Sequence, residues 1–384
     1  MTLPDESAKG GQVAAVLELR RTDAGAARSR AAHLLPTIER RLGNNNISKI
    51  SRDEPANVAI DWLLAAELRR HLADHDGALM AAYEAVTLAQ CAGQWLSAAS
   101  TPNSLLDAVV DAIGLVRTNR GRLYRLCYLP LRSEHGETAV ARVDHALAAH
   151  LKEVHSLPDH PRQRPRFFYF PGLRDEPYMD PQTHPWASRL QSAFSDIRDE
   201  AIGLIRKEGL LEDFVRVRPG DRIENYLAGA KPSWEGFFFY RHGLRHDTNH
   251  AVCPVTSEVL DSIELCEIKG HAPEILFSVL RPGTTILAHH GVTNVRAVMH
   301  LPLIVPPDCA LNLVGVGEHH WREGELVMFD DTFEHEAWNR SNHPRVVLLM
   351  DCWNPQLTSI ERQAVALLID TMGRLHRAAK AATP

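Results

Sequence analysis

The chain has little cysteine, and its few cysteines follow no metal-ligand pattern. There are six in 384 residues, and none forms a Cys-x-x-Cys pair. Such pairs are the usual signature of a structural zinc site, so the sequence predicts none. Six cysteines in a chain of this length do not indicate a disulfide framework either, and they are typical of a reducing compartment.

Targeting and membrane signals are also missing from the sequence. The first residues, Met1-Thr-Leu-Pro-Asp-Glu-Ser, have neither the basic start nor the apolar stretch of a signal peptide. No apolar run approaches the roughly 20 residues that cross a bilayer as a helix. We therefore expect a cytoplasmic protein without a membrane span.

An excess of positive charge is lacking as well. The net charge is −6, with 42 basic and 48 acidic side chains. Basic pairs such as Arg20-Arg21 and Arg40-Arg41 lie in helical stretches, where solvated helix faces explain them. The composition therefore excludes nucleic acid as an expected partner. A hydrophobic content of 45% is ordinary for a globular protein, and the length suggests two domains.

Residues 1–160 are rich in alanine and leucine and show little strand alternation, which predicts an α-helical N-terminal domain. One stretch matches a degenerate tetratricopeptide helix pair, in which Gln90 replaces the closing proline. A stable array needs about three repeats, so a plain helical layer is the alternative. The packing residues of the pair would be Trp62, Ala66, Ala78 and Ala85.

The second domain is expected over residues 161–384. The aromatic run Arg166-Phe-Phe-Tyr-Phe and residues 234–240 predict strands, and a helix is expected from Trp186 onward. Pro254 begins a further short helix. A last helix is expected over residues 360–378, where Thr358 and Glu361 make a capping box.

Between residues 274 and 353 the pattern is that of short strands separated by turns. Strands with this spacing are typical of a jelly-roll, or double-stranded β-helix, barrel of the cupin type. The sequence therefore predicts an α+β protein with a helical first domain and a barrel in the second. The expected strands are residues 275–280, 284–288, 295–305, 310–316, 325–329, 336–340 and 346–352.

Two histidines of this barrel follow strand-like runs. His289 lies in Arg281-Pro-Gly-Thr-Thr-Ile-Leu-Ala-His-His-Gly and His335 in Phe329-Asp-Asp-Thr-Phe-Glu-His-Glu-Ala-Trp. Neutral imidazole is a good ligand for Fe(II), and two on neighbouring strands can point at one ion. The usual non-haem iron site adds a carboxylate two residues after the first histidine, but that residue is Gly291. We predict a two-histidine iron site in which water could take the place of the carboxylate.

Nearby titratable side chains have structural explanations. His290 would point to the opposite face of a regular strand, so we do not take it as a ligand. Asp330 and Asp331 precede His335 and are expected to form a turn or hydrogen bonds. His319-His320 is expected in a solvated hairpin turn.

An arginine opens the apolar strand over residues 346–352. Burial of Arg345 at the barrel would require an anion beside it. A guanidinium is a bidentate partner for a carboxylate, so we predict that Arg345 binds the far carboxylate of a dianionic keto acid. The hydroxyl of Ser278 could add a hydrogen bond.

Residues from about 166 to 362 resemble the aspartyl/asparaginyl β-hydroxylases, a family of Fe(II)- and 2-oxoglutarate-dependent oxygenases. Several segments carry the resemblance together, and their combination is far more specific than any one motif. They are Phe277-Ser-Val-Leu-Arg-Pro-Gly-Thr, His289-His-Gly-Val-Thr-Asn-Val-Arg, Met299-His-Leu, Trp321-Arg-Glu-Gly-Glu, Phe329-Asp-Asp-Thr-Phe-Glu-His-Glu-Ala-Trp and Val347-Leu-Leu-Met-Asp-Cys-Trp-Asn-Pro-Gln-Leu-Thr.

The resemblance implies a role for each matched residue. Metal ligands are implied at His289 and His335, and glycine at position 291 agrees with the family's two-histidine site. A substrate contact is implied at Arg296, although the family often carries a second arginine where this chain has Val298. Contacts to 2-oxoglutarate are implied at Arg345, Ser278 and His300, with Trp234 near the same pocket.

The implied reaction is a hydroxylation by O2 in which 2-oxoglutarate loses CO2 and becomes succinate. The implied substrate is an aspartyl or asparaginyl residue in a peptide or protein, or a related small amino-acid derivative. The lack of a second arginine makes an aspartyl side chain a less secure choice. Two alternatives stay open: an oxygenase of the same mechanism acting on a specialised metabolite, and a non-catalytic binding module that kept the barrel.

Overall fold

The structure is a computed structural model that describes residues 15–44, 55–207, 209–215 and 222–381. The chain divides into two compact units. The helical unit comprises residues 1–130 with 371–384, and the sheet unit comprises residues 131–370. The expected domains, residues 1–160 and 161–384, stay a prediction. The compact units are instead divided after residue 130 and again after residue 370.

Two contacts explain why the units differ from the expected division. Arg142 belongs with the sheet unit, where its guanidinium lies 3.3 Å from the Glu361 carboxylate and 5.2 Å from the centre of the Phe170 ring. Arg374, from the last helix, donates to the Glu84 carboxylate at 2.6 and 2.9 Å within the helical unit. Long-range ion pairs of this kind leave no local pattern in a sequence.

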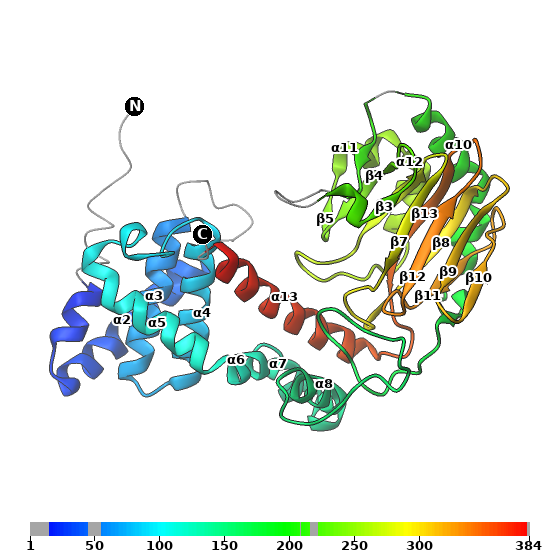
Figure 1. The fold of residues 1–384 in the computed structure, drawn as a ribbon. Coiled ribbons are helices and arrows are strands. Elements are labelled where there is room, and N and C mark those ends of the chain that lie inside the picture. The colour runs from blue at the N-terminus through cyan, green and yellow to red at the C-terminus, as the bar shows by residue number, and fades with distance from the viewer. Residues whose placement is uncertain (1–14, 45–54, 208, 216–221, 382–384) are drawn as a thin grey trace. The chain divides into compact units, whose positions relative to one another are not determined.

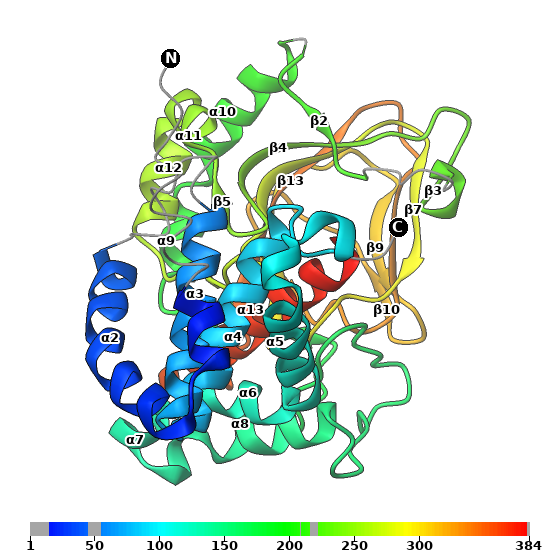
Figure 2. The ribbon, with the colours of Figure 1, turned by 90° about the vertical axis from the view of Figure 1, so that its left-hand side faces the viewer.

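The N-terminal part is helical, as expected (Figures 1 and 2). Helices α3 and α4 pack as a pair, and the Asp74 carboxylate caps α4 by accepting from the Gly77 N–H at 2.9 Å. Ala66, Ala78 and Ala85 are buried in this unit, so the two helices approach closely. The tetratricopeptide assignment stays a prediction. The helices of this part are α2 (Ala24–Asn44), α3 (Pro55–His71), α4 (His75–Cys91), α5 (Leu106–Thr118) and α6 (Arg120–Leu126), with 3-10 turns η2 (Ala98–Ser100) and η3 (Asn103–Leu105).

The remaining helices flank the sheets or follow them. The helix expected from Trp186 is interrupted at Ala193, where α9 ends and α10 begins. The capping box at the last helix is confirmed: the Thr358 N–H donates to Glu361 at 2.8 Å, and the Glu361 N–H donates to the Thr358 hydroxyl at 3.2 Å. These helices are α7 (Leu129–His135), α8 (Glu137–His150), α9 (Ala187–Ser192), α10 (Phe194–Ile205), α11 (Asp247–Val252), α12 (Pro254–Asp261) and α13 (Ser359–Ala381), with η4 (Pro181–Thr183) and η5 (Ile223–Asn225).

Two antiparallel sheets form the sheet unit. The larger has the order β1-β11-β8-β13-β6-β4-β2, with β5 paired to β4, and the smaller has the order β10-β9-β12-β7-β3. The strands are β1 (Tyr178–Met179), β2 (Glu212–Asp213), β3 (Leu227–Ala228), β4 (Trp234–Arg241), β5 (Leu244–Arg245), β6 (Ile275–Leu280), β7 (Thr284–His289), β8 (Arg296–Ile304), β9 (Cys309–Leu313), β10 (Gly317–His319), β11 (Val327–Phe329), β12 (His335–Asn339) and β13 (Arg345–Trp353).

From β6 to β13 the chain alternates between the sheets, except that the consecutive strands β9 and β10 both lie in the smaller sheet. Strands β6, β8, β11 and β13 lie in the larger sheet, and β7, β9, β10 and β12 lie in the smaller. One face of the larger sheet packs against apolar residues of α10 and α12, and its other face shares a core with the smaller sheet. The central strands of the larger sheet are therefore covered on both faces, which explains the continuous apolar run of β6.

Two local expectations were wrong. The aromatic run after Arg166 forms no strand among the described residues; Phe168 makes only an isolated bridge to Thr293, and its side chain is buried. His319, expected with His320 in a turn, is instead the last residue of strand β10, which pairs with β9. The seven strands expected after residue 274 are confirmed, with ends that differ by up to three residues.

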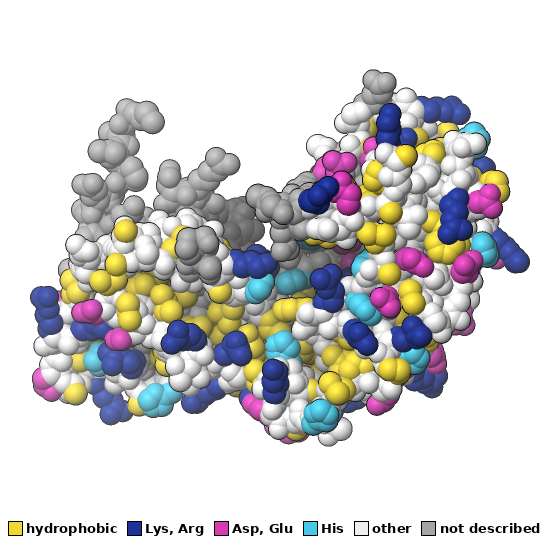
Figure 3. All heavy atoms as spheres, in the orientation of Figure 1, with side chains coloured by type: hydrophobic (Ala, Val, Ile, Leu, Met, Phe, Trp, Pro, Cys, Tyr) yellow, Lys and Arg dark blue, Asp and Glu magenta, His cyan; other side chains and the backbone are white. Residues whose placement is uncertain are grey.

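The described residues include no helix both long and apolar enough to cross a membrane. On the face drawn in Figure 3, Lys and Arg side chains are interspersed with Asp and Glu over both units. The described residues on that face therefore present no large patch of a single charge sign.

Candidate active site

A cavity of about 150 Å³ lies between the two sheets of the sheet unit. Strands β4, β6, β7, β8, β9, β11, β12 and β13 contribute side chains to its wall. All seven residues that the sequence singled out line it: Trp234, Ser278, His289, Arg296, His300, His335 and Arg345. The fold thus brings together positions spread over more than a quarter of the chain.

His289 and His335 face each other across the β7–β12 pair. They are direct register partners, and their ring centres are 4.1 Å apart. The Nδ1 of His289 lies 2.8 Å from the Leu287 carbonyl, and that of His335 lies 2.9 Å from the Phe333 carbonyl. A carbonyl can only accept, so each Nδ1 carries the proton and each Nε2 keeps a free lone pair. This arrangement suits two metal-binding imidazoles.

Burial keeps both rings neutral. It lowers the pKa of His289 and lowers the pKa of His335 to about 4, in the second case with help from the neighbouring His289 ring. Both histidines are therefore unprotonated at neutral pH, which is the form that binds a metal ion.

The side chain of Asp331 occupies the space next to Gly291. A Cβ atom added at Gly291 would lie 2.1 Å from the Asp331 carboxyl carbon, so any larger residue there would collide with it. One oxygen of Asp331 lies 3.1 Å from the Arg296 guanidinium, and the other is buried without a hydrogen-bond partner. The contact with Arg296 agrees with the expected turn-forming or hydrogen-bonding role of Asp331, and its side chain also lines the cavity.

Asp330 behaves as the sequence suggested. Its carboxylate accepts hydrogen bonds from the Thr332 N–H at 2.8 Å and from the Gln163 amide at 2.7 Å. Among the residues that the structure describes, no three His, Cys, Asp or Glu side chains gather closely enough to hold a metal ion. Any ion held by His289 and His335 would need further ligands from outside this described set of side chains.

Arg345 is a buried cation that forms no ion pair within the described part of the chain. Only 2% of its surface is exposed, its Nε has no hydrogen-bond partner, and its guanidinium lies 5.0 Å from the centre of the Trp321 ring. Burial lowers its pKa to about 10, so it stays charged at neutral pH. An unpaired guanidinium in such a place is energetically costly unless an anion binds it.

Two further polar side chains, Ser278 and His300, lie at the same end of the cavity as Arg345. The Ser278 hydroxyl accepts a hydrogen bond from the Trp234 indole at 2.9 Å, which leaves its own proton free to donate. Both ring nitrogens of His300 are buried without a partner. Burial, and then the charge of Arg345, hold the pKa of His300 well below its usual value, so this ring is neutral.

Arg296, at the start of β8, is neutralised by the protein itself. Its guanidinium lies 3.1 Å from Asp331 and 2.7 Å from Asp351. Burial alone would lower its pKa, but these two carboxylates raise it above the usual value. The arginine expected to contact the substrate thus differs from Arg345 in that its charge is already balanced.

The structure also shows which neighbouring side chains line the cavity and which do not. The Nδ1 of His290 hydrogen-bonds to the Thr332 carbonyl at 3.0 Å, and this ring does not line the cavity. Sequence reasoning missed Glu274, Trp321 and Asp351, which do line it. The one available signal was the even spacing of Arg345 and Asp351, which puts both on one face of β13.

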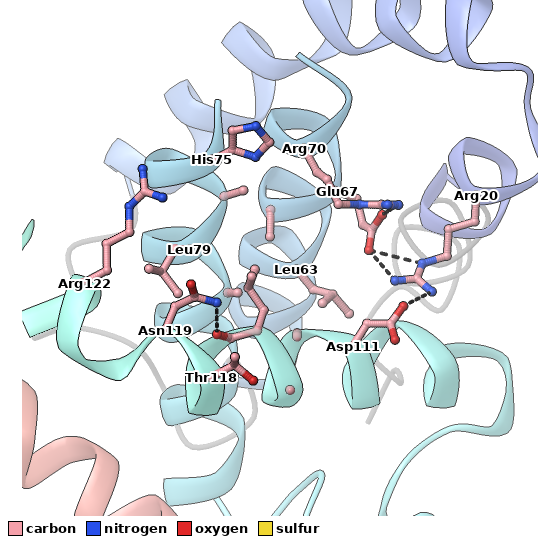
Figure 4. A pocket seen from close by; sticks show the side chains of 16 residues that line it. Arg20, Leu63, Glu67, Arg70, His75, Leu79, Asp111, Thr118, Asn119 and Arg122 are labelled. Atoms are coloured by element: carbon pink, nitrogen blue, oxygen red, sulfur yellow. Dashed lines mark hydrogen bonds and ion pairs between the residues drawn. The ribbon is translucent and has the colours of Figure 1, made fainter. Parts of the chain in front are cut away.

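The helical unit contains a larger cavity of about 530 Å³. Figure 4 shows Arg20 between Glu67 and Asp111, at distances of 2.5 and 2.9 Å. Arg70 also pairs with Glu67, and Arg122 pairs with Asp76. Every arginine and carboxylate in this wall has a partner within the protein.

The sequence of this chain is similar to that of a hydroxylase family. The family model for aspartyl/asparaginyl β-hydroxylase matches residues 191–355. The human protein named aspartate β-hydroxylase domain-containing protein 2 is 32% identical over 289 residues, which cover 68% of this chain and 74% of that protein. The chain therefore belongs to the aspartyl/asparaginyl β-hydroxylase family.

Two other relatives differ in the substrates that their names give. Human aspartyl/asparaginyl β-hydroxylase is 30% identical over 200 residues, which cover 50% of this chain and 25% of that protein. An ornithine lipid ester-linked acyl 2-hydroxylase from Rhizobium tropici is 30% identical over 185 residues, covering 48% of this chain and 62% of that protein. The names of these relatives specify a hydroxylase and two different substrate classes.

Proposed function

We propose that this chain is an Fe(II)- and 2-oxoglutarate-dependent dioxygenase that hydroxylates its substrate with O2. The observation that carries the proposal is the buried, unpaired guanidinium of Arg345 in the same cavity as two neutral histidines with free Nε2 atoms. His289 and His335 would hold the iron, and Arg345 would bind the far carboxylate of 2-oxoglutarate. The iron and the keto acid supply, when bound, the oxidising power that the side chains lack.

The chain's own side chains bind, orient and exclude water. Ser278 is placed to donate a hydrogen bond to the carboxylate bound by Arg345, and its oxygen is held by Trp234. His300 is neutral, so it adds no second positive charge there. Trp321, Phe329 and Leu311 line the same cavity and keep water from the bound groups, which strengthens each ionic contact.

We propose that the alternation of strands β6 to β13 between the two sheets is that of a double-stranded β-helix, or jelly roll. The cytoplasmic location expected from the sequence stays a prediction.

For the substrate we propose an aspartyl or asparaginyl residue in a peptide or protein, or a related amino-acid derivative. The name of the human β-hydroxylase supports a residue of this kind. A specialised metabolite is the second candidate, and the name of the Rhizobium lipid hydroxylase favours keeping it. A non-catalytic binding module is the third candidate, and it differs from an enzyme in that it would form no succinate.

The test is succinate formation by the full chain from 2-oxoglutarate, with Fe(II) and O2. We expect His335→Ala to lower the rate at least about a hundredfold, because even the outer partners of metal ligands contribute tenfold to a hundredfold. The matched control is His320→Ala, since His320 is a solvent-exposed histidine paired with Glu318. Equal rates in the two variants, or no succinate from the unaltered chain, would refute the proposal.

A further inference from the structure

Residues 160–170 form a strap across the two loops next to the histidines of the cavity. The first loop, residues 290–295, follows His289, and the second, residues 330–334, precedes His335. Backbone hydrogen bonds tie the strap to both loops, since its N–H groups donate to loop carbonyls at 2.9 to 3.1 Å. These bonds run from Arg166 to Gly291, from Phe167 and Phe168 to Val292, and from Arg164 to Thr332.

Side chains also hold the strap at both ends. Near its start, the Gln163 amide donates to the Asp330 carboxylate at 2.7 Å. At its other end, the Phe170 N–H donates to the Asn294 side-chain oxygen at 2.8 Å, and the Asn294 amide donates back to the Phe170 carbonyl at 2.9 Å. All four residues are buried, so the strap is a fixed part of the sheet unit and its exposed side chains extend from defined positions.

Three arginines lie on the solvent side of the strap. Arg162, Arg164 and Arg166 are exposed, whereas Gln163, between the first two, is buried. The Cα atoms of Arg162 and Arg166 are at most about 14 Å apart, because four residues of chain reach no farther. No ion pair among the described residues includes any of the three, although the Arg164 Nε donates to the Pro161 carbonyl at 3.3 Å. These three guanidiniums, the arginine row, can therefore bind an anion from outside the chain.

The strap itself contains no Asp or Glu. Burial and then the charge of Asp159 raise the pKa of Asp175, so these two carboxylates lie together, and His160 at the start of the strap also acts on Asp175. They are therefore placed at the Arg162 end of the row.

The second loop offers the row little counter-charge. Asp330 is already hydrogen-bonded within the chain, and Asp331 lies 3.1 Å from the Arg296 guanidinium. Glu334 is the one further carboxylate in residues 330–334, so this loop has at most one charge for three arginines.

The row begins beside the cavity. The Arg166 N–H is bonded to Gly291, two residues after His289. Burial is the main cause of the low pKa of His289, and the charge of Arg166 lowers this pKa further, so the guanidinium lies within electrostatic reach of the ring. From there the row leads to Arg162, which lies against Gly315 in the turn between β9 and β10. A chain that places one residue at the cavity would meet the row with the neighbouring residues.

The shape of the row suits a single extended chain. It is one residue wide, and alternate carboxylates of an extended peptide are about 7 Å apart, which matches arginines two residues apart. A guanidinium binds a carboxylate through two parallel hydrogen bonds, and arginine clusters are a recurring means of recognising acidic segments. A lipid surface spreads its charge in two dimensions, so a row of three arginines offers it little contact.

We propose that Arg162, Arg164 and Arg166 bind an acidic segment of a peptide or protein substrate, next to the residue that enters the cavity. This inference deepens the proposed function and rests on it for the position of the reacting residue beside the iron. It gives the strap a part in substrate selection that is separate from the side chains lining the cavity.

The experiment compares two labelled peptides on the full chain, without iron or 2-oxoglutarate. The acidic probe carries one asparagine followed by three glutamates at alternate positions, with glycine between them, and in the neutral probe glutamine replaces each glutamate. Binding is followed by the fluorescence anisotropy of a rhodamine label at low salt. We expect the acidic probe to bind about tenfold more tightly, because three exposed ion pairs act together. The net charge of −6 opposes this result, so general attraction does not explain it.

Removal of the row should abolish the preference. The triple variant Arg162→Gln, Arg164→Gln and Arg166→Gln should bind the two probes equally. If that variant does not fold, Arg166→Gln alone keeps the backbone bond to Gly291 and should reduce the preference about twofold. Raising the ionic strength to about 0.5 M should reduce the preference of the unaltered chain to less than about threefold.

The matched control removes the same charge elsewhere on the sheet unit. The triple variant Arg189→Gln, Arg222→Gln and Arg322→Gln changes exposed arginines that each already lie near a glutamate, and it should keep the preference. Equal binding of the two probes by the unaltered chain, or an equal loss in the control, would overturn the inference.

Vesicles of equal parts phosphatidylcholine and phosphatidylglycerol test the rival ligand. Vesicle binding that requires the row, with no preference between the peptides, would assign the row to a membrane surface and reject the acidic peptide. Because neither probe needs iron, the result is independent of succinate formation. A preference for the acidic probe without succinate would refute the proposed function alone, and succinate without the preference would refute this inference alone.

Discussion

The cavity of the helical unit and the cavity between the sheets differ in a way that their sizes do not suggest. The cavity of the helical unit is the larger, at about 530 Å³ against about 150 Å³, yet each of its arginines and carboxylates has a partner. In the cavity between the sheets, five buried polar atoms of the wall have no hydrogen-bond partner. They belong to His300, Trp321, Asp331 and Arg345.

In this protein, buried polar atoms without hydrogen-bond partners therefore indicate a binding site better than the volume of a cavity does. Folded proteins rarely leave buried polar atoms unpaired, because each one costs free energy. A wall that carries several of them is stable only if something else satisfies them, whereas a wall of closed ion pairs is already complete. The predictions below test this contrast, beginning with the largest expected effect.

Replacing the unpaired cation should affect cosubstrate binding most. We expect Arg345→Met to raise the 2-oxoglutarate concentration needed for half-maximal succinate formation about a hundredfold, since a buried charge partner is worth 2–5 kcal/mol. Metal affinity should change little. The control is Arg340→Met, because Arg340 also lies over a tryptophan, Trp338, at 4.5 Å, but is exposed. An unchanged requirement in Arg345→Met would contradict its role.

The same substitution should have opposite effects on stability in the two cavities. Without ligands, Arg345→Met removes a buried charge that has no partner, so the free energy of unfolding should rise by about 1–4 kcal/mol. Arg20→Met leaves the buried Glu67 with Arg70 alone, and the free energy of unfolding should fall by about 1–2 kcal/mol. Urea unfolding of the ligand-free chain measures both. A lower free energy of unfolding in both variants would contradict the proposed difference between the two cavities.

A single added methyl group should also distinguish the two walls. Gly291→Ala places a Cβ 2.1 Å from the Asp331 carboxyl carbon, and we expect a loss of about 1–3 kcal/mol together with weaker metal binding. Gly114→Ala, in helix α5 at the helical cavity, meets nothing within 4 Å and should be neutral or stabilising by up to about 1 kcal/mol. Thermal unfolding and Mn(II) titration provide the readouts. A tolerated Gly291→Ala would show that Asp331 can move aside freely.

The sequence predicted well what local pattern determines. The strands after residue 274 combine β-branched and apolar residues with clear turns, so their positions were recognisable without a partner strand. The capping box at Thr358 is similar, because both of its hydrogen bonds lie within three residues. His289, His335 and Arg345 lie at the ends of strands that were predicted correctly. Because these strands belong to the two facing sheets, the three side chains meet in one cavity.

What the sequence could not predict depends on register and on distant partners. Asp331 was expected to form a turn or hydrogen bonds, but nothing local shows that its partner is Arg296, at the start of β8, the strand that pairs with β11 just before Asp331. The aromatic run after Arg166 was interpreted as a strand, although Phe168 and Phe170 are buried by loop packing and not by a ladder. Burial of aromatic side chains requires an apolar surface nearby, and strand geometry is only one way to provide it.

The last helix has a consequence for how this protein is made. Leu375 packs on the core of the helical unit, and Arg374 donates to Glu84 and lies 4.7 Å from the centre of the Tyr83 ring. A chain emerging from the ribosome presents residues 15–130 long before these partners exist. Arg374 is synthesised 290 residues after Glu84, so this contact can form only once the sheet unit has been translated, and until then Tyr83 and its neighbours are accessible to chaperones.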